Sequence, residues 1–288
     1  MSAREIRVAA SRVGLVVGLV SILGLAGCPH HVRIERPYPP PTAASLRELV
    51  RARQQQVRTL NGRVRATSWI GGDRVKATVL VLAERPGRLR LEAEVTLQGT
   101  VAVLATDGAR FAFLDTRHNE LRRGPACPAN VASLIRIPLA PQDVAAILLG
   151  DGPPVAPAAS EDDRVTWDGD LGADVLDVPA VSGNGRVHYA IKQLGNRIQI
   201  AAVTAVAAGS SPIWRVSFED FTDVRASSDP TAPALSLPET VHFAEATAPF
   251  DEGVEIHFKD RTLNDPSPPE AFTLNAPPST PTLEVPCP

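Results

Sequence analysis

RLRLEAEVTL, residues 88–97, alternates apolar and polar side chains without interruption. The apolar set is Leu89, Leu91, Ala93, Val95 and Leu97. Because successive side chains of a strand point to opposite faces, this stretch predicts an antiparallel strand with one buried and one solvated face. Such a strand needs neighbouring strands beside it and a second layer that covers its apolar side.

Similar runs with a period of two surround residues 88–97, separated by turns such as Arg85-Pro86-Gly87. The runs predict strands at residues 75–84, 100–106, 109–115, 119–123, 186–192, 196–203, 213–219, 239–244, 254–259 and 272–274. Since the links between consecutive runs are short, we expect antiparallel pairing in one continuous sheet.

Two regions show helical spacing instead. Ser45 and Glu48 form a capping-box pattern before an amphipathic helix that we expect to end at about Leu60, before Gly62. Shorter helices are predicted at residues 130–137 and 141–149, followed by a loop at 151–163. The order of elements predicts an α+β fold, in which a single curved antiparallel sheet wraps over α-helices. A filled core and a ligand cavity both fit this pattern.

The N-terminus has the features of an exported lipoprotein. Three arginines precede an uncharged apolar run, Val13–Leu25, and Leu25-Ala26-Gly27-Cys28 follows it. This order is typical of a cleavable signal peptide, and the apolar run is short for a membrane span. The last four residues resemble the bacterial lipobox, which implies cleavage after residue 27 and lipid attachment to Cys28. Pro29 follows where an inner-membrane retention signal would have Asp, so we expect outer-membrane anchoring on the periplasmic face, with surface exposure left open.

Composition narrows the class of partner. The net charge is −3, and removal of residues 1–27, which contain three Arg and one Glu, makes it about −5. The sequence contains no basic run, which argues against nucleic acid as a partner. Besides Cys28, the sequence contains Cys127 and Cys287. In an oxidising compartment such a pair suggests a disulfide, and the alternative is two free thiols.

Composition shifts predict four segments along the chain. Residues 1–27 are the signal peptide, and residues 28–44 a lipidated, proline-rich tether. Residues 45–275 would form the folded domain, and residues 276–288 a proline-rich tail.

The sequence offers no motif for catalysis or for a metal. It contains no His-Glu-x-x-His, no Cys-x-x-Cys and no Gly-x-Ser-x-Gly sequence. His188, His242 and His257 fall on the polar faces of predicted strands, and His30-His31 lies on the tether. We therefore expect a protein that is not an enzyme and that needs no cofactor or metal.

Several stretches, in order along residues 45–275, resemble the LolA/LolB-like superfamily of periplasmic lipoprotein carriers. They are the N-terminal helix ending in VRTLNG at 57–62, the RPGRLRLE stretch at 85–92, ATDG at 105–108 before FAF at 111–113, ILLG at 147–150, LPE at 237–239, LN at 263–264 and FTL at 272–274. The resemblance implies an incomplete β-barrel, covered by helices, whose apolar cavity holds acyl chains. The insertion at 151–185 and the long tail depart from the family pattern, and the protruding apolar loop residue of the anchored receptors has no evident counterpart.

With this resemblance the leading hypothesis is an anchored, monomeric protein that receives or inserts lipoproteins or lipids at the outer membrane. Its partners would be the membrane, lipoprotein or lipid cargo and a periplasmic carrier. The alternative is a structural or assembly lipoprotein with a solid core that binds protein partners. The candidate residues lining an acyl cavity are Trp69, Leu80, Leu82, Leu89, Leu91, Phe111, Phe113, Trp214, Phe218, Phe243 and Phe258.

Overall fold

The computed structural model describes residues 33–70, 73–95, 97–181, 184–195, 197–226, 231, 233–246 and 253–287. The predicted signal peptide and Cys28 lie outside these residues. Among the residues described, no helix is long and apolar enough to span a membrane.

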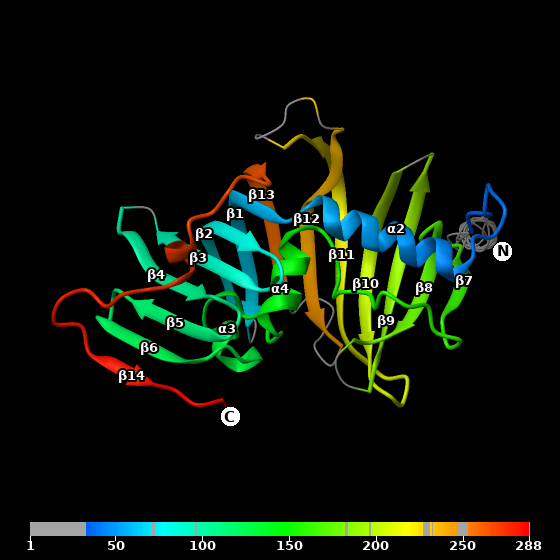
Figure 1. Cartoon of the computed structure of the whole chain (residues 1–288). Helices are drawn as coiled ribbons and strands as arrows, with labels where there is room; N and C mark the ends of the chain where they lie inside the picture. The colour runs from blue at the N-terminus through cyan, green and yellow to red at the C-terminus, as the bar shows by residue number, and fades with distance from the viewer. Residues whose placement is uncertain are drawn as a thin grey trace, which may run out of the picture.

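One sheet organises the molecule (Figure 1). Among the described residues it has 14 strands in the order β14-β6-β5-β4-β3-β2-β1-β13-β12-β11-β10-β9-β8-β7, and β14 and β7 are its two ends. The strands of the first half are β1 (Thr59–Ile70), β2 (Asp73–Glu84), β3 (Arg88–Val95), β4 (Gly99–Thr106), β5 (Arg110–Asp115) and β6 (Glu120–Pro125). Those that follow are β7 (Arg164–Asp168), β8 (Ala173–Pro179), β9 (Arg186–Leu194), β10 (Arg197–Val206), β11 (Pro212–Val224), β12 (Leu235–Glu245), β13 (Val254–Leu263) and β14 (Thr282–Glu284).

The sheet consists of two meanders, β1–β6 and β7–β13, joined where β1 pairs with β13. All these pairs are antiparallel, as the short links predict, and β14 alone pairs in parallel, with β6. The sheet is open and curved, so the predicted α+β class with a single curved sheet is confirmed.

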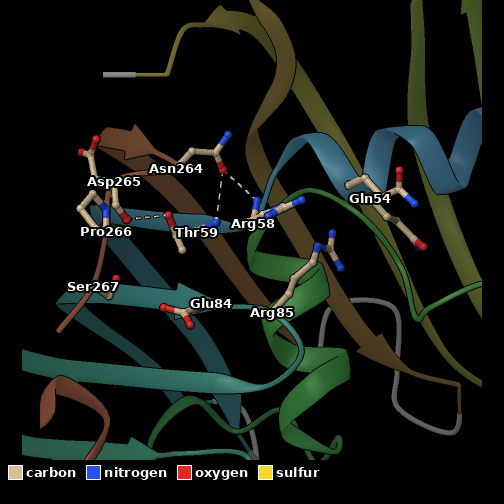
Figure 2. Close-up of a pocket in the computed structure, with 10 residues that line it drawn as sticks. Gln54, Arg58, Thr59, Glu84, Arg85, Asn264, Asp265, Pro266 and Ser267 are labelled. Atoms are coloured by element: carbon tan, nitrogen blue, oxygen red, sulfur yellow. Dashed lines mark hydrogen bonds between the residues drawn. The ribbon is translucent and has the colours of Figure 1, made fainter. Parts of the chain in front are cut away.

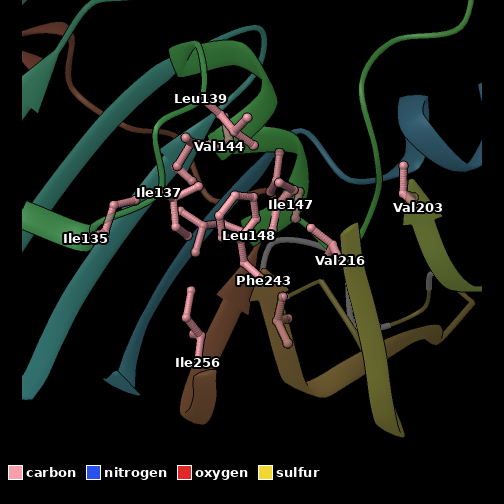
Figure 3. Packing of buried hydrophobic residues seen from close by; sticks show 14 of the residues in the cluster. Ile135, Ile137, Leu139, Val144, Ile147, Leu148, Val203, Val216, Phe243 and Ile256 are labelled. Atoms are coloured by element: carbon pink, nitrogen blue, oxygen red, sulfur yellow. The ribbon is translucent and has the colours of Figure 1, made fainter. Parts of the chain in front are cut away.

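In the part of the chain that the structure describes, three helices cover the concave side: α2 (Ala43–Gln56), α3 (Pro128–Ile135) and α4 (Pro141–Leu148). In Figure 1, α2 lies across the second meander, while α3 and α4 follow β6 and lie against the first. Side chains from residues 135–148 interdigitate with those of β12 and β13 (Figure 3), and one continuous apolar cluster links all three helices to the sheet. The interior of this structure is therefore packed with side chains.

Some predicted elements were wrong in detail. The N-cap of α2 is Thr42, whose hydroxyl accepts from the Ser45 amide, because Ala43 and Ala44 extend the helix before Ser45. The helix ends at Gln56 rather than near Leu60, since β1 begins at Thr59 and pairs with β2. The predicted strand at 272–274 is absent, and Pro269–Phe272 forms the 3-10 helix η1 instead.

The insertion at 151–185 contains a hairpin that the sequence analysis missed. Residues 164–168 and 173–179 form β7 and β8, which extend the sheet at one end. Their short length and the acidic residues within them, such as Asp174 and Asp177, masked the alternation.

The C-terminal segment also packs on the sheet. We call residues 273–287 the C-terminal strap. Its Leu274 and Ala276 cover a small apolar cluster on the convex face of β4–β6, and β14 pairs with the edge of β6. A disulfide joins Cys127, before α3, to Cys287 at the end of the strap.

Candidate functional site

The concave face of the sheet contains most of the residues predicted to line a cavity. Eight of the candidates are buried in the main apolar cluster: Leu89, Leu91, Phe111, Phe113, Trp214, Phe218, Phe243 and Phe258. They come from five strands of both meanders, and the helices cover them. The structure therefore brings these residues onto one surface, with helical side chains in contact with it.

Trp69, Leu80 and Leu82 lie on the convex face, so their prediction as cavity residues was wrong. In β2, Val79 and Val81 enter the core, and strand alternation turns Leu80 and Leu82 outward. Trp69 pairs in register with Arg74, whose guanidinium lies 5.3 Å from the Trp69 ring centroid. These three residues were predicted from their apolar character alone, whereas strand alternation decides which face of the sheet each side chain occupies.

Helix α2 is fastened to the rest of the fold by polar contacts as well as by apolar ones. Four of its residues are buried, Leu46, Arg47, Val50 and Arg53, and two of these are arginines. Arg47 binds Asp163 through Nε and Nη2, with 2.9 Å between Nε and Oδ2, and its Nη1 donates to the Ala156 carbonyl. The 151–163 loop thus connects the buried side of α2 to the sheet.

The same loop is fixed near the C-terminal end of α2. Gln54 donates to the carbonyls of Gly152 and Pro153, and the buried Tyr189 hydroxyl donates to Pro153. A Cβ at Gly152 would lie 2.7 Å from Cε1 of Tyr189, so glycine permits this close approach. Burial raises the pKa of Tyr189, which keeps this hydroxyl a donor.

Charged groups are buried beneath this part of α2. Asp151 is fully buried and accepts from Arg85, while Arg53 Nε lies 3.8 Å from Asp151 Oδ1. Arg261 donates to the carbonyls of Pro238 and Leu237. Burial lowers the pKa of Arg85, and it lowers the pKa of Arg261 to about 10. The nearby charge of Arg53 lowers both further, so these cations repel one another.

An open polar pocket of about 660 Å³ adjoins this cluster (Figure 2). It lies where α2 ends and β1 begins, and it is lined by Gln54, Gln55, Arg58, Thr59, Glu84, Arg85, Asn264, Asp265, Pro266 and Ser267. Asn264 closes one side by accepting from the Arg58 amide and donating to the Gln56 carbonyl. A second pocket, of about 300 Å³, lies around Leu80 and Arg63. Neither pocket is the apolar cavity that was expected.

The strand pattern placed Leu97 on the buried face of residues 88–97, and this prediction was wrong. Leu97, in the turn between β3 and β4, is 101 % exposed and has φ of 70°. This backbone conformation is unfavourable for a bulky residue, and exposure of the side chain adds to the cost. Strand β3 ends at Val95, and Leu97 and Gln98 lie in the turn before β4, so the alternating pattern does not set the direction of the Leu97 side chain.

The histidines are dispersed, and among the described residues no group of three or more His, Cys, Asp or Glu side chains is placed to hold a metal ion. His242 and His257 lie on the convex face, where His242 nitrogens are 3.9 Å from Glu219 and Glu255. His188 lies 3.4 Å from Asp177.

Asp143, in the first turn of α4, gives a pH-dependent test of this interior. Burial raises its pKa from 3.8 to about 6. Between these values the unfolded chain loses this proton before the folded chain does, so folding stability falls as pH rises and the penalty is complete above about 6. Asp143→Asn should therefore be more stable than the parent at pH 8 by roughly 1–3 kcal/mol.

The measurement is urea unfolding at pH 4 and pH 8 for both proteins. The advantage of Asp143→Asn should shrink toward zero at the lower pH. An advantage of the same size at both values would show that the carboxylate is not destabilised by burial.

Comparison with known proteins places this architecture among solved structures. No family model matches the chain, and no curated protein matches it in sequence. A LolA superfamily protein from Nitrosomonas europaea is similar in structure, with a TM-score of 0.53, 11% identity, and coverage of 82% of this chain and 99% of that one.

Two further structures share the arrangement. A DUF1329 family protein from Desulfovibrio piger has a TM-score of 0.55 and 8% identity, over 80% of this chain and 97% of its own. A domain from Vibrio parahaemolyticus, named for outer membrane lipoprotein sorting, has a TM-score of 0.51 and 9% identity, over 80% of this chain and 97% of its own. The chain therefore has the LolA/LolB-like fold.

Proposed function

We propose that this protein is a membrane-anchored, non-enzymatic carrier that binds acyl chains of lipids or lipoproteins between α2 and the concave face of the sheet. The observation that carries the proposal is the contrast between the helices. In α4, all six buried residues are apolar or proline, whereas half of the buried residues of α2 are arginines. A helix held by polar contacts regains water contacts when it lifts, so its opening costs less than removing an apolar helix.

In the open form, the apolar concave face beneath α2 would accept an acyl chain and complete a half-barrel around it. Residues such as Phe218, Trp214 and Val216 would then exchange helix contacts for chain contacts. Burial contributes on the order of 0.8 kcal/mol for each CH2 group, without any need for directional contacts. This explains why a carrier of this kind needs no catalytic or metal-binding residue.

Lipid on Cys28 would hold one end of the sheet near the membrane. Residues 33–38 contact β7 and β8: the Ile34 amide donates to Gly169, Trp167 donates to Ile34, and Arg36 Nη2 lies 2.8 Å from Asp174. Burial and the hydrogen bond to Asp174 raise the pKa of Tyr38 to about 12. Arg33 is five positions after Cys28, so the reach of the anchor is at most about 18 Å.

In this proposal Leu97 is the exposed apolar residue that contacts the cargo. In the proposed cycle it meets acyl chains as they pass between the fold and a bilayer. Its exposure and its unfavourable φ fit a residue kept for contact rather than for folding.

The filled interior favours a second candidate, an envelope-assembly lipoprotein whose core admits no lipid. The helices pack into the concave face, and neither pocket lies within it. Lipid binding discriminates between the two functions.

The first test uses the chain from Pro29 onward, purified without detergent and extracted for lipid analysis by mass spectrometry. We expect co-purified lipid, and displacement of that lipid by a fluorescent acyl probe at a ratio near one to one. A folded sample with neither lipid nor probe binding would exclude the carrier function and leave the assembly function.

The second prediction concerns the fastening of α2. Asp163→Asn removes the carboxylate that binds the buried Arg47, so α2 should open more often and probe association should accelerate roughly tenfold or more. Asp260→Asn is the matched control, because its ion pair with Arg63 is exposed on the convex face. Stopped-flow fluorescence measures both variants, and equal association rates would show that α2 does not gate binding.

The third prediction concerns Leu97. Leu97→Gly should leave stability unchanged or slightly higher, since glycine accepts a positive φ, while transfer of the probe to vesicles slows several-fold. Val181→Gly, which removes another exposed apolar side chain, should transfer at the parent rate. Unchanged transfer by Leu97→Gly would remove this residue from the mechanism.

A further inference from the structure

The buried charges beneath the C-terminal end of α2 do not balance. Arg53, Arg85 and Arg261 lie close enough for Arg53 to act on the other two, and Asp151 is the carboxylate that Arg53 and Arg85 share. Among the described residues, the hydrogen-bond partners of Arg261 are carbonyl and hydroxyl groups, although the charge of Glu239 is favourable for this cation. Burial of cations without matching anions is costly, so this arrangement calls for a reason.

Arg53 is the member of this cluster with an unsatisfied hydrogen-bond donor. The residue is 5 % exposed, and its Nη1 has no hydrogen-bond partner within the part of the chain that the structure describes. Asp151 Oδ1, 3.8 Å from Arg53 Nε, also accepts no hydrogen bond there. A buried donor without a partner lowers the stability of the fold, because it loses its hydrogen bonds to water and forms none within the protein.

The polar pocket opens beside this cluster. Arg85 lines the pocket with one part of its side chain and binds Asp151 through Nη2. Arg58 also lines the pocket, and its guanidinium makes no ion pair or hydrogen bond with any described residue. Figure 2 shows both side chains extending toward α2. The acids of the pocket are Glu84, which pairs with Arg88 at 2.5 Å, and Asp265.

The pocket lies at the rim of the sheet, where β1 begins. Val57 and Leu60 are buried in the main cluster, and their chain neighbours Arg58 and Thr59 line the pocket. A lipid with its charged group in the pocket would pass its apolar chain over this rim to the core.

We infer that this pocket binds the oxyanion head group of the lipid, with Arg58 and Arg85 at its mouth and Arg53 behind them. The inference rests on the proposed function and narrows its ligand to anionic lipids, such as those with a phosphate head. Guanidinium groups suit this ligand because they donate paired hydrogen bonds to oxyanions. Asp151 binds Arg85 and lies 3.8 Å from Arg53 in the closed form, and the head group competes with it for these two arginines.

The test compares dodecyl phosphate with dodecyl maltoside, two probes with the same chain and different head-group charge. Binding to the chain from Pro29 onward is measured by calorimetry, together with inorganic phosphate alone. We expect dodecyl phosphate to bind roughly tenfold or more tightly than dodecyl maltoside, and phosphate alone to bind far more weakly than dodecyl phosphate.

Two variants separate the head-group site from a structural role. Arg58→Gln, at an exposed position, should keep its fold and reduce the preference for dodecyl phosphate several-fold without changing maltoside binding. Asp151→Asn removes the competing carboxylate, so it should bind dodecyl phosphate more tightly even if it is less stable. Arg63→Gln, on the convex face, should match the parent, and circular dichroism reports the fold of each.

The outcomes are distinct. Equal binding of both dodecyl probes, or loss of both together in Arg58→Gln, would overturn the head-group site and leave the carrier function. If inorganic phosphate binds as tightly as dodecyl phosphate, the ligand of the pocket is a free anion and not a lipid head group. Binding of neither dodecyl probe to the folded parent would overturn both proposals.

Discussion

Burial of one continuous apolar sheet face is the constraint on which the rest of this structure depends. Strand alternation turns residues such as Leu91, Phe113 and Val216 to the same side of a sheet that extends through both meanders. That side must be covered, and α2, α3 and α4 are the elements available to cover it. Helices α3 and α4 form the link between the two meanders, so their position over the concave face follows from the chain path.

The helices that cover the sheet differ in the side chains that they bury, and the proposed function depends on this difference. Helix α4 is buried through apolar residues such as Val144 and Ile147, which keeps it fixed in the core. Helix α2 relies instead on Arg47 and Arg53, whose partners lie in the 151–163 loop. Buried ion pairs contribute little net stability, yet they specify where a helix docks. A helix positioned in this way suits an element that opens and returns to the same place.

The ends of the chain strengthen opposite ends of the sheet. The C-terminal strap covers the convex face of β4–β6 and is tied to Cys127, so it also protects the edge of β6. Residues 33–38 bind β7 and β8 around the buried Asp174, at the other end. These two segments looked like a stalk and a tail because their prolines mask the contacts that they make through backbone groups and a few side chains.

The sequence by itself determined the class of the fold, most strand positions and the concave set of residues such as Leu89 and Leu91, because alternation is a local property of the chain. It also carried the resemblance that pointed to the LolA/LolB-like fold, which the structural neighbours share. Tertiary structure alone decided that Leu80 and Leu82 face outward, that α3 and α4 fill the interior, and that Arg53, Arg85 and Arg261 meet around Asp151. These residues are up to about two hundred positions apart, and their proximity depends on strand pairing and chain path, which no local pattern encodes.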